Sequence, residues 1–111
     1  MSTSPPTIGQ RRLRVVLEEP VESADDIGGV TRSFQPRITL WAQLAPVSAS
    51  ERSEAQQTGS RITHRLSLRW RGDITSAMRF VAGPGVFDIR GQYDPDGRRR
   101  TLVCLVEEER P

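Results

Sequence analysis

The chain has 111 residues, a formal net charge of +2 and a single cysteine. This length allows one domain with a thin core. Because Cys104 and His64 are the only residues of their kinds, an internal disulfide and a Cys/His zinc site are excluded. No apolar run approaches the roughly 18 residues of a membrane span, and residues 1–10 lack the apolar stretch of a secretory signal. We therefore expect an intracellular, soluble, metal-free protein with no membrane partner.

All sixteen basic residues are arginine, and the chain contains neither lysine nor asparagine. Codon bias in a GC-rich genome is one explanation, because lysine and asparagine share A-rich codons. The other explanation is selection for the bidentate contacts that guanidinium groups make. The small net charge does not by itself indicate nucleic-acid binding, which usually shows as a clustered basic surface.

The first expected element is a flexible arm at residues 1–9, which are small, polar and rich in proline. A single folded domain is expected over residues 10–108. Its first strand is indicated by the apolar residues that alternate between positions 13 and 17. Pro20 is expected to end this strand.

Residues 21–35 are expected to form a hairpin or a long turn, because Gly28 and Gly29 supply the positive φ that a tight turn needs. The next strand is expected at residues 37–45, where apolar residues alternate again. Trp41 lies on the face opposite to those apolar residues, so we expect that second face to be covered as well.

Residues 46–60 interrupt the strand pattern and make the longest connection in the chain. Val47 is their only branched apolar side chain, and either Ser48 or Ser50 is a candidate cap for a short helix with Glu51 in its first turn. Connections of this length are commonly functional or disordered.

The segment 61–71 has the clearest strand pattern of the chain. One face carries Ile62, His64, Leu66, Leu68 and Trp70. The other face carries a stripe of four arginines: Arg61, Arg65, Arg69 and Arg71. Same-face neighbours on a strand lie roughly 6.6 Å apart, so these charges need water, acidic groups or phosphate around them. A solvated face, acidic groups of a neighbouring subunit and DNA are the three interpretations.

Further strands are expected at residues 78–82, 86–90 and 101–106, separated by turns that contain glycine and proline. Residues 101–106 are apolar on both faces, which is typical of a central strand, and residues 109–111 are expected to form a tail. The sequence predicts an all-β fold, a small closed barrel or sandwich of about six strands. A closed architecture is expected because closure removes exposed strand edges. The fold is expected to contain one long inter-strand loop and at most one short helix.

No set of residues indicates catalysis. His64 has apolar neighbours on its own face, so it is interpreted as a hydrogen-bonded core or rim histidine. Cys104 lies on a strand with a buried pattern and is expected to be an inert thiol. Asp94 and Asp96 flank a proline, and turn formation accounts for both. We expect no catalytic residue, no metal ion and no cofactor.

A series of short motifs in order along nearly the whole chain resembles the phage head–tail joining proteins. These are also called head-closure or stopper proteins, and their relatives occur in gene transfer agents. The similar segments are residues 12–20, 26–30, 40–42, 63–71, 73–79, 87–90, 94–96, 98–100 and 102–108. Each motif is weak alone, and their order and spacing carry the resemblance.

The resemblance implies a structural protein that forms a homo-oligomeric ring, sixfold by preference with a twelvefold ring as the alternative. The ring would lie in the neck of a virion or gene transfer agent particle, after assembly in the bacterial cytoplasm. Its neighbours would be the adaptor or portal ring on the head side and the tail terminator or tail tube on the tail side. Double-stranded DNA would pass through it without sequence specificity and be retained. The alternative function is a small OB-like barrel that binds single-stranded nucleic acid.

Two sets of candidate site residues follow from these expectations. The candidate channel-gating loop comprises Val47, Ser48, Ala49, Ser50, Glu51, Arg52, Ser53, Glu54, Ala55, Gln56, Gln57, Thr58, Gly59 and Ser60. A disordered surface loop and a docking loop for an adjoining ring are the alternatives for it. The candidate subunit interface joins the four arginines of the stripe to acidic partners: Asp25, Asp26, Glu107, Glu108 and Glu109.

Overall fold

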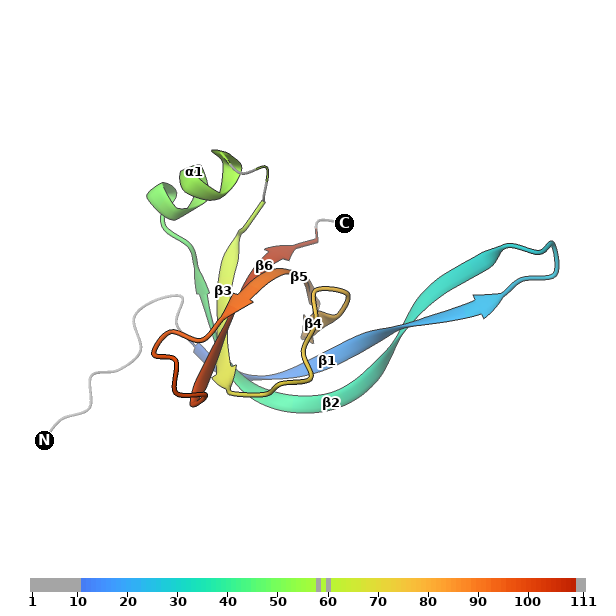
Figure 1. Cartoon of the computed structure of the whole chain (residues 1–111), viewed down its shortest axis with the longest axis horizontal. Helices are drawn as coiled ribbons and strands as arrows, with labels where there is room; N and C mark the ends of the chain where they lie inside the picture. Colours follow the sequence, from blue (N-terminus) through green and yellow to red (C-terminus); the bar gives the residue numbers. More distant parts are fainter. Residues whose placement is uncertain (1–10, 58, 60, 110–111) are drawn as a thin grey trace, which may run out of the picture.

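Six antiparallel strands close into a barrel in the computed structural model of the chain, which describes residues 11–57, 59 and 61–109 (Figure 1). Around the barrel the strands follow the order β1-β2-β3-β6-β5-β4. In chain order the elements are β1 (Arg11–Ala24), β2 (Val30–Pro46), α1 (Ala49–Gln57), β3 (His64–Arg69), β4 (Arg79–Ala82), β5 (Gly85–Tyr93) and β6 (Thr101–Glu108). The expected all-β class, with a closed barrel and one short helix, is confirmed. The arm expected at residues 1–9 lies outside the described residues.

Alternate residues of the strands fill the barrel interior, as the sequence pattern predicted. The most enclosed of the large side chains are Val15, Leu17, Leu66, Phe80, Ile89, Cys104 and Val106. β6 pairs with β3 on one side and with β5 on the other, so its expected central position is confirmed. A core of this kind leaves the outer faces of the strands available for other contacts.

The prediction that Pro20 ends the first strand is wrong, because β1 continues to Ala24. β1 pairs with β4 only over Val16–Glu18, so beyond Glu18 one edge of β1 has no neighbouring strand. A proline removes a hydrogen-bond donor, and a strand with an open edge tolerates that loss. The prediction failed because it treated Pro20 as part of a strand with hydrogen-bonded neighbouring strands at both edges.

The parts of β1 and β2 beyond the barrel form a two-stranded arm, which we call the ribbon (residues 19–35). Its six residue pairs run from Glu19–Gln35 to Ala24–Val30, a length of about 20 Å. Figure 1 shows the ribbon extending away from the barrel, and the whole molecule measures 62 × 32 × 30 Å. The expected hairpin is therefore present, and it is longer than the sequence pattern indicated.

Ion pairs fix the base of the ribbon to the barrel. The guanidinium of Arg37 in β2 binds Glu19 across the ribbon at 3.0 Å and Asp73, after β3, at 3.1 Å. Arg71 donates two further hydrogen bonds to Asp73, at 3.0 and 2.9 Å. One network thus joins β1, β2 and the segment after β3 at the point where the ribbon leaves the barrel.

A second arginine holds the ribbon from the other side. Arg79 of β4 donates a hydrogen bond to Glu18 at 2.7 Å, next to the irregularity in β1 between Leu17 and Glu18. Its guanidinium also lies 3.9 Å from the ring centroid of Phe34 in the ribbon. The ion pair and the cation–π contact together fix the direction in which the ribbon projects.

The connection at residues 46–60 contains α1, which Ser48 caps. The Ser48 hydroxyl accepts the backbone N–H of Glu51 at 3.2 Å, while Glu51 reaches back toward the Ser48 N–H at 3.5 Å. None of the helical side chains is buried. A polar helix of nine residues is marginal by its own propensity, so few contacts hold α1 in place.

The Asp73 network predicts a pH-dependent stability. Hydrogen bonds from Arg71 first and Arg37 second lower the pKa of Asp73 from 3.8 to about 2. A lowered pKa stabilises the folded state above pH 3.8, and this contribution is lost as the pH falls through about 2. Asp73→Asn should therefore lower the free energy of unfolding by up to about 1 kcal/mol at pH 7, as is usual for exposed ion pairs, and by almost nothing at pH 2. Urea unfolding across this pH range measures the difference.

The control for this experiment is Asp26→Asn, which removes the same charge from an exposed position at the end of the ribbon. It should leave the stability close to that of the wild type at each pH. A loss in Asp73→Asn that is the same at pH 7 and pH 2 would contradict the role of the ionised carboxylate.

Candidate functional site

Large apolar side chains remain exposed chiefly at two places. At the end of the ribbon, Ile27 is 94% and Val30 is 67% exposed. On β2 nearer the barrel, Trp41 is 55% and Ile38 is 36% exposed. An exposed apolar patch with polar surroundings is typical of a protein–protein contact, so both places are candidate assembly surfaces.

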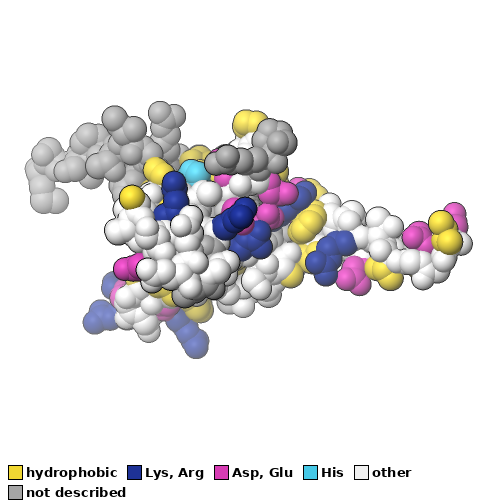
Figure 2. All heavy atoms as spheres, turned by 90° about the horizontal axis from the view of Figure 1, so that it is seen from above, with side chains coloured by type: hydrophobic (Ala, Val, Ile, Leu, Met, Phe, Trp, Pro, Cys, Tyr) yellow, Lys and Arg dark blue, Asp and Glu magenta, His cyan; other side chains and the backbone are white. Residues whose placement is uncertain are grey.

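The end of the ribbon is a locked turn, which we call the ribbon tip (residues 25–30). The Asp25 carboxylate accepts the backbone N–H groups of Ile27 at 2.9 Å and of Gly29 at 2.7 Å. A Cβ on Gly29 would lie 2.7 Å from that carboxylate, so any larger residue there would displace the side chain that holds the turn. The turn presents Ile27 outward beside Asp26, and Figure 2 shows apolar and acidic side chains together at this end of the molecule.

Trp41 lies on the outer face of β2 between two guanidinium groups. The Arg12 and Arg14 guanidinium carbons lie 5.5 and 5.8 Å from its ring centroid. Register places Arg14 directly opposite Trp41 on β1, a neighbour that sequence alone does not reveal. The expectation that this face is covered is wrong at Trp41 for the single chain, since more than half of its side chain is exposed.

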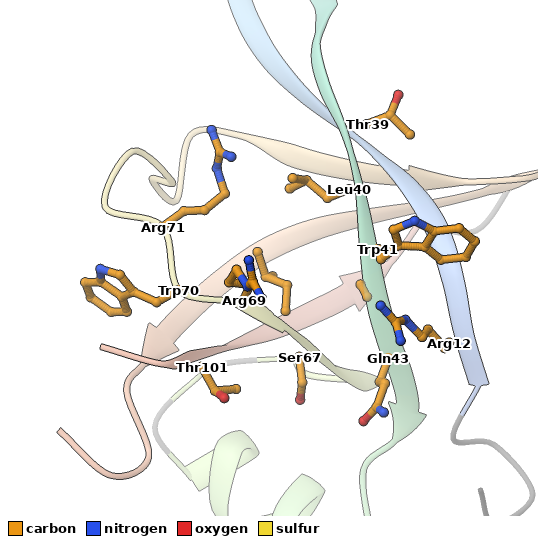
Figure 3. Close-up of a pocket in the computed structure, with 12 residues that line it drawn as sticks. Arg12, Thr39, Leu40, Trp41, Gln43, Ser67, Arg69, Trp70, Arg71 and Thr101 are labelled. Carbon is orange, nitrogen blue, oxygen red and sulfur yellow. The ribbon is translucent and has the colours of Figure 1, made fainter. Parts of the chain in front are cut away.

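A groove of about 640 Å³ runs past Trp41 from β2 to β3, and we call it the tryptophan groove (Figure 3). Its side chains include those of Arg12, Trp41, Gln43, Ser67, Arg69, Trp70 and Arg71. No acidic residue is among the described residues that line it. In Figure 3 Trp41 and Arg12 lie on the side of β2 that faces β1, while Arg69 and Trp70 lie on its other side, at the end of β3 and just beyond it. The groove combines aromatic surface with positive charge.

The four arginines of the predicted stripe differ in whether they form an ion pair. Arg65 pairs with Glu51 of α1 at 3.3 Å, and Arg71 pairs with Asp73 at 2.9 Å. The remaining two are exposed and form no ion pair within the described part of the chain: Arg61 and Arg69. Sequence reasoning missed both internal partners.

The predicted acidic partners are divided in the same way. Asp25 locks the ribbon turn, Glu107 binds Arg90 at 2.9 Å, and Glu109 approaches Arg79 at 3.6 Å. Two carboxylates form no ion pair with any residue that the structure describes: Asp26 and Glu108. Of the two, Asp26 lies farthest from the barrel, at the ribbon tip.

The candidate gating loop begins beside the barrel. Val47 is buried, and its N–H donates a hydrogen bond to the Thr63 carbonyl at 3.1 Å. A cleft of about 380 Å³, with Tyr93 among its lining residues, separates α1 from β5. Two residues of the predicted loop lie outside the described residues: Thr58 and Ser60.

The two groups with nucleophilic or acid–base chemistry are enclosed. His64 is half-buried, its Nδ1 lies 2.8 Å from the Thr63 hydroxyl, and its ring meets Phe87 edge to face at 5.3 Å between centroids. Burial lowers the pKa of His64. Cys104 is fully buried, which raises the pKa of its thiol to about 12. Cys104 therefore lies in the core and His64 is hydrogen-bonded at its edge, as the sequence predicted.

Asp94 and Asp96 build a turn. The Asp94 carboxylate accepts the Arg99 N–H at 2.7 Å, and Asp96 binds the Arg100 guanidinium at 2.7 Å. The described residues contain no cluster of three His, Cys, Asp or Glu side chains suited to a metal ion. They also contain no helix with the length and apolar character needed to cross a membrane.

Comparisons with known proteins agree with this geometry. The family model described as phage head completion protein matches residues 6–109. A protein of Shigella flexneri 2a with a solution structure is 31% identical, with a TM-score of 0.69 over 92% of this chain and 96% of that chain. A chain of the virion of a native gene transfer agent particle is 27% identical, with a TM-score of 0.64 over 89% and 96%. No curated protein matches.

The expected resemblance to phage head–tail proteins with relatives in gene transfer agents is thus confirmed. The family match spans almost the whole barrel together with the ribbon and α1. The chain belongs to the phage head completion protein family.

Proposed function

We propose that the protein is a connector in the particle neck. It forms a ring between the portal or adaptor of the head and the tail, retains packaged DNA and gives the tail a docking surface. The family gives the coarser role, a structural part of the phage head, and similarity to a chain of a gene transfer agent virion supports a place in a particle. The observation that carries the proposal is that the ribbon tip and the tryptophan groove both expose apolar surface on one small chain.

The same proposal assigns the gate to residues 47–60. No side chain of α1 is buried, and its ion pair with β3, between Glu51 and Arg65, is half exposed. Exposed ion pairs contribute little, so α1 can move while the barrel stays folded. The charges of Glu51, Arg52 and Glu54 give the loop a net −1, which avoids tight binding to phosphate. Ring symmetry brings one copy per subunit to the axis.

A second candidate function is single-stranded nucleic-acid binding, and the exposed Trp41 between Arg12 and Arg14 is the observation that favours it. Such barrels stack successive bases on several aromatic side chains along a cationic groove. Here the platform is short, because Phe80 and Phe87 are buried in the core. The connector function uses both exposed surfaces, whereas nucleic-acid binding uses one.

Deleting the gene in a particle-producing strain tests the connector function. Heads should fill with DNA, remain without tails and then lose their DNA, because neither the docking surface nor the closure is present. Electron microscopy counts tailed particles, and nuclease sensitivity measures retained DNA. Normal numbers of tailed, DNA-retaining particles would overturn the proposal.

Shortening residues 49–58 to a Gly-Ser linker tests the gate. The barrel should stay folded and the protein should still enter particles, because α1 contributes no buried side chain. Packaged heads should then leak DNA before tails attach, which nuclease treatment of tailless heads detects. If the shortened protein is present in the particles and DNA is retained as in the wild type, residues 47–60 are not the gate.

Trp41 fluorescence separates the two candidate functions. The connector proposal predicts that short single-stranded oligonucleotides cause no salt-dependent quenching. Trp41→Ala is the matched control, because it removes the exposed indole and leaves Trp70. Quenching that weakens with salt and disappears in Trp41→Ala would favour the nucleic-acid function instead.

A further inference from the structure

We propose that the ribbon tip of one subunit docks into the tryptophan groove of the next copy of the same chain. This inference rests on the proposed function, because it describes how neighbouring subunits of the ring contact one another. The contact joins two different surfaces, so each subunit gives one and receives one. Such a heterologous contact generates a closed ring when the rotation between subunits closes.

The two surfaces are complementary in chemistry. The tip carries Ile27, almost fully exposed, beside the carboxylate of Asp26. The groove carries the half-exposed indole of Trp41, and none of its lining residues that the structure describes is acidic. Arg12 and Arg69 line the groove without an acidic partner among the described residues. Docking would place an apolar side chain on the indole and a carboxylate between guanidinium groups.

The ribbon is prepared for such a contact before it binds. Its turn is held by the Asp25 carboxylate, and its base is held by Arg37 and Arg79. A segment that is already ordered loses little conformational entropy on docking. Ile27 is therefore presented at a fixed position rather than by a mobile loop.

Features of the ribbon edges favour docking by the tip over addition of a further strand. Pro20 lies in the ribbon and Pro36 at its base, and neither has a backbone N–H to offer to a further strand. An ion pair between Arg32 and Glu22 at 3.3 Å crosses the ribbon near its end. Prolines and charges are the usual means by which proteins keep open strand edges from pairing. The apolar surface is instead concentrated at the turn.

The reach of the ribbon matches the width of the molecule. Val30 and Trp41 are eleven residues apart on β2, a distance of about 35 Å along an extended strand. The chain measures 30 to 32 Å across its shorter axes. The tip therefore cannot reach its own groove, and a neighbour lying side by side presents its groove at about the distance that the tip reaches.

Crosslinking between introduced cysteines in assembled particles tests the contact. Thr31→Cys places a thiol on the ribbon beside the tip, and Gln43→Cys places one in the groove. Cys104 remains silent because it is fully buried. A short bismaleimide added to particles that carry both substitutions should give a ladder of covalent oligomers of this chain on a denaturing gel. Mass spectrometry should identify the peptide that joins residues 31 and 43.

The matched control pairs Gln43→Cys with Ser76→Cys, an exposed position outside the ribbon, and should give no ladder. No crosslink between residues 31 and 43, or a crosslink from residue 31 to a different particle protein, overturns the self-docking contact. Both results leave the connector function standing if gene deletion still gives tailless heads. Normal tailed particles after deletion would refute the connector function whatever the crosslink shows.

A pair of exposed substitutions gives an independent measurement if the cysteine variants do not enter particles. Ile27→Ser and Trp41→Ala should each lower the yield of tailed particles about tenfold without changing the thermal unfolding of the free chain. The double variant should lose no more than the worse single variant, because both changes remove one contact. Losses that multiply, or no loss in either variant, overturn the proposal.

Discussion

β1 and β2 are longer than the barrel that they help to close, and the shape of the rest of the molecule depends on this difference in length. β1 has only three residues paired with β4, and β2 has five paired with β3. The two strands pair with each other from Arg11–Leu44 to Ala24–Val30, well beyond the part that has a third strand beside it. The excess becomes the ribbon, which leaves a small barrel with an arm that ends in exposed apolar and acidic side chains.

Contacts of arginine side chains make the ribbon rigid where it leaves the barrel. Arg37 binds two carboxylates at once, and Arg79 combines an ion pair to Glu18 with a face-on contact to Phe34. A lysine ammonium supplies a point charge but not the planar fork that makes such double contacts. Every basic residue of the chain is arginine, and these contacts show that the fold uses the guanidinium group where the ribbon meets the barrel.

The sequence predicted the features that local periodicity controls. The alternation around Leu66 and Leu68 gave the barrel strand, and Ser48 with Glu51 gave the capped helix. Features set by register escaped prediction, because pairing between distant strands is not encoded locally. Arg14 stands beside Trp41 only because β1 and β2 pair in one particular register. The prediction that Pro20 ends β1 failed for the same reason. β1 accommodates this proline because one of its edges has no neighbouring strand there, and that depends on how the distant strands pair.

One strand joins every surface to which the proposals assign a role. β2 starts at Val30 beside the ribbon tip, passes Trp41 in the tryptophan groove and ends at Pro46, two residues before the cap of α1. A hydrogen-bonded strand is stiff along its length, whereas no side chain of α1 is buried. Within a ring of docked subunits, the same strand that fixes a neighbour also sets the point from which the gating helix projects. Under the two proposals, ring assembly and placement of the gate would both depend on this single element.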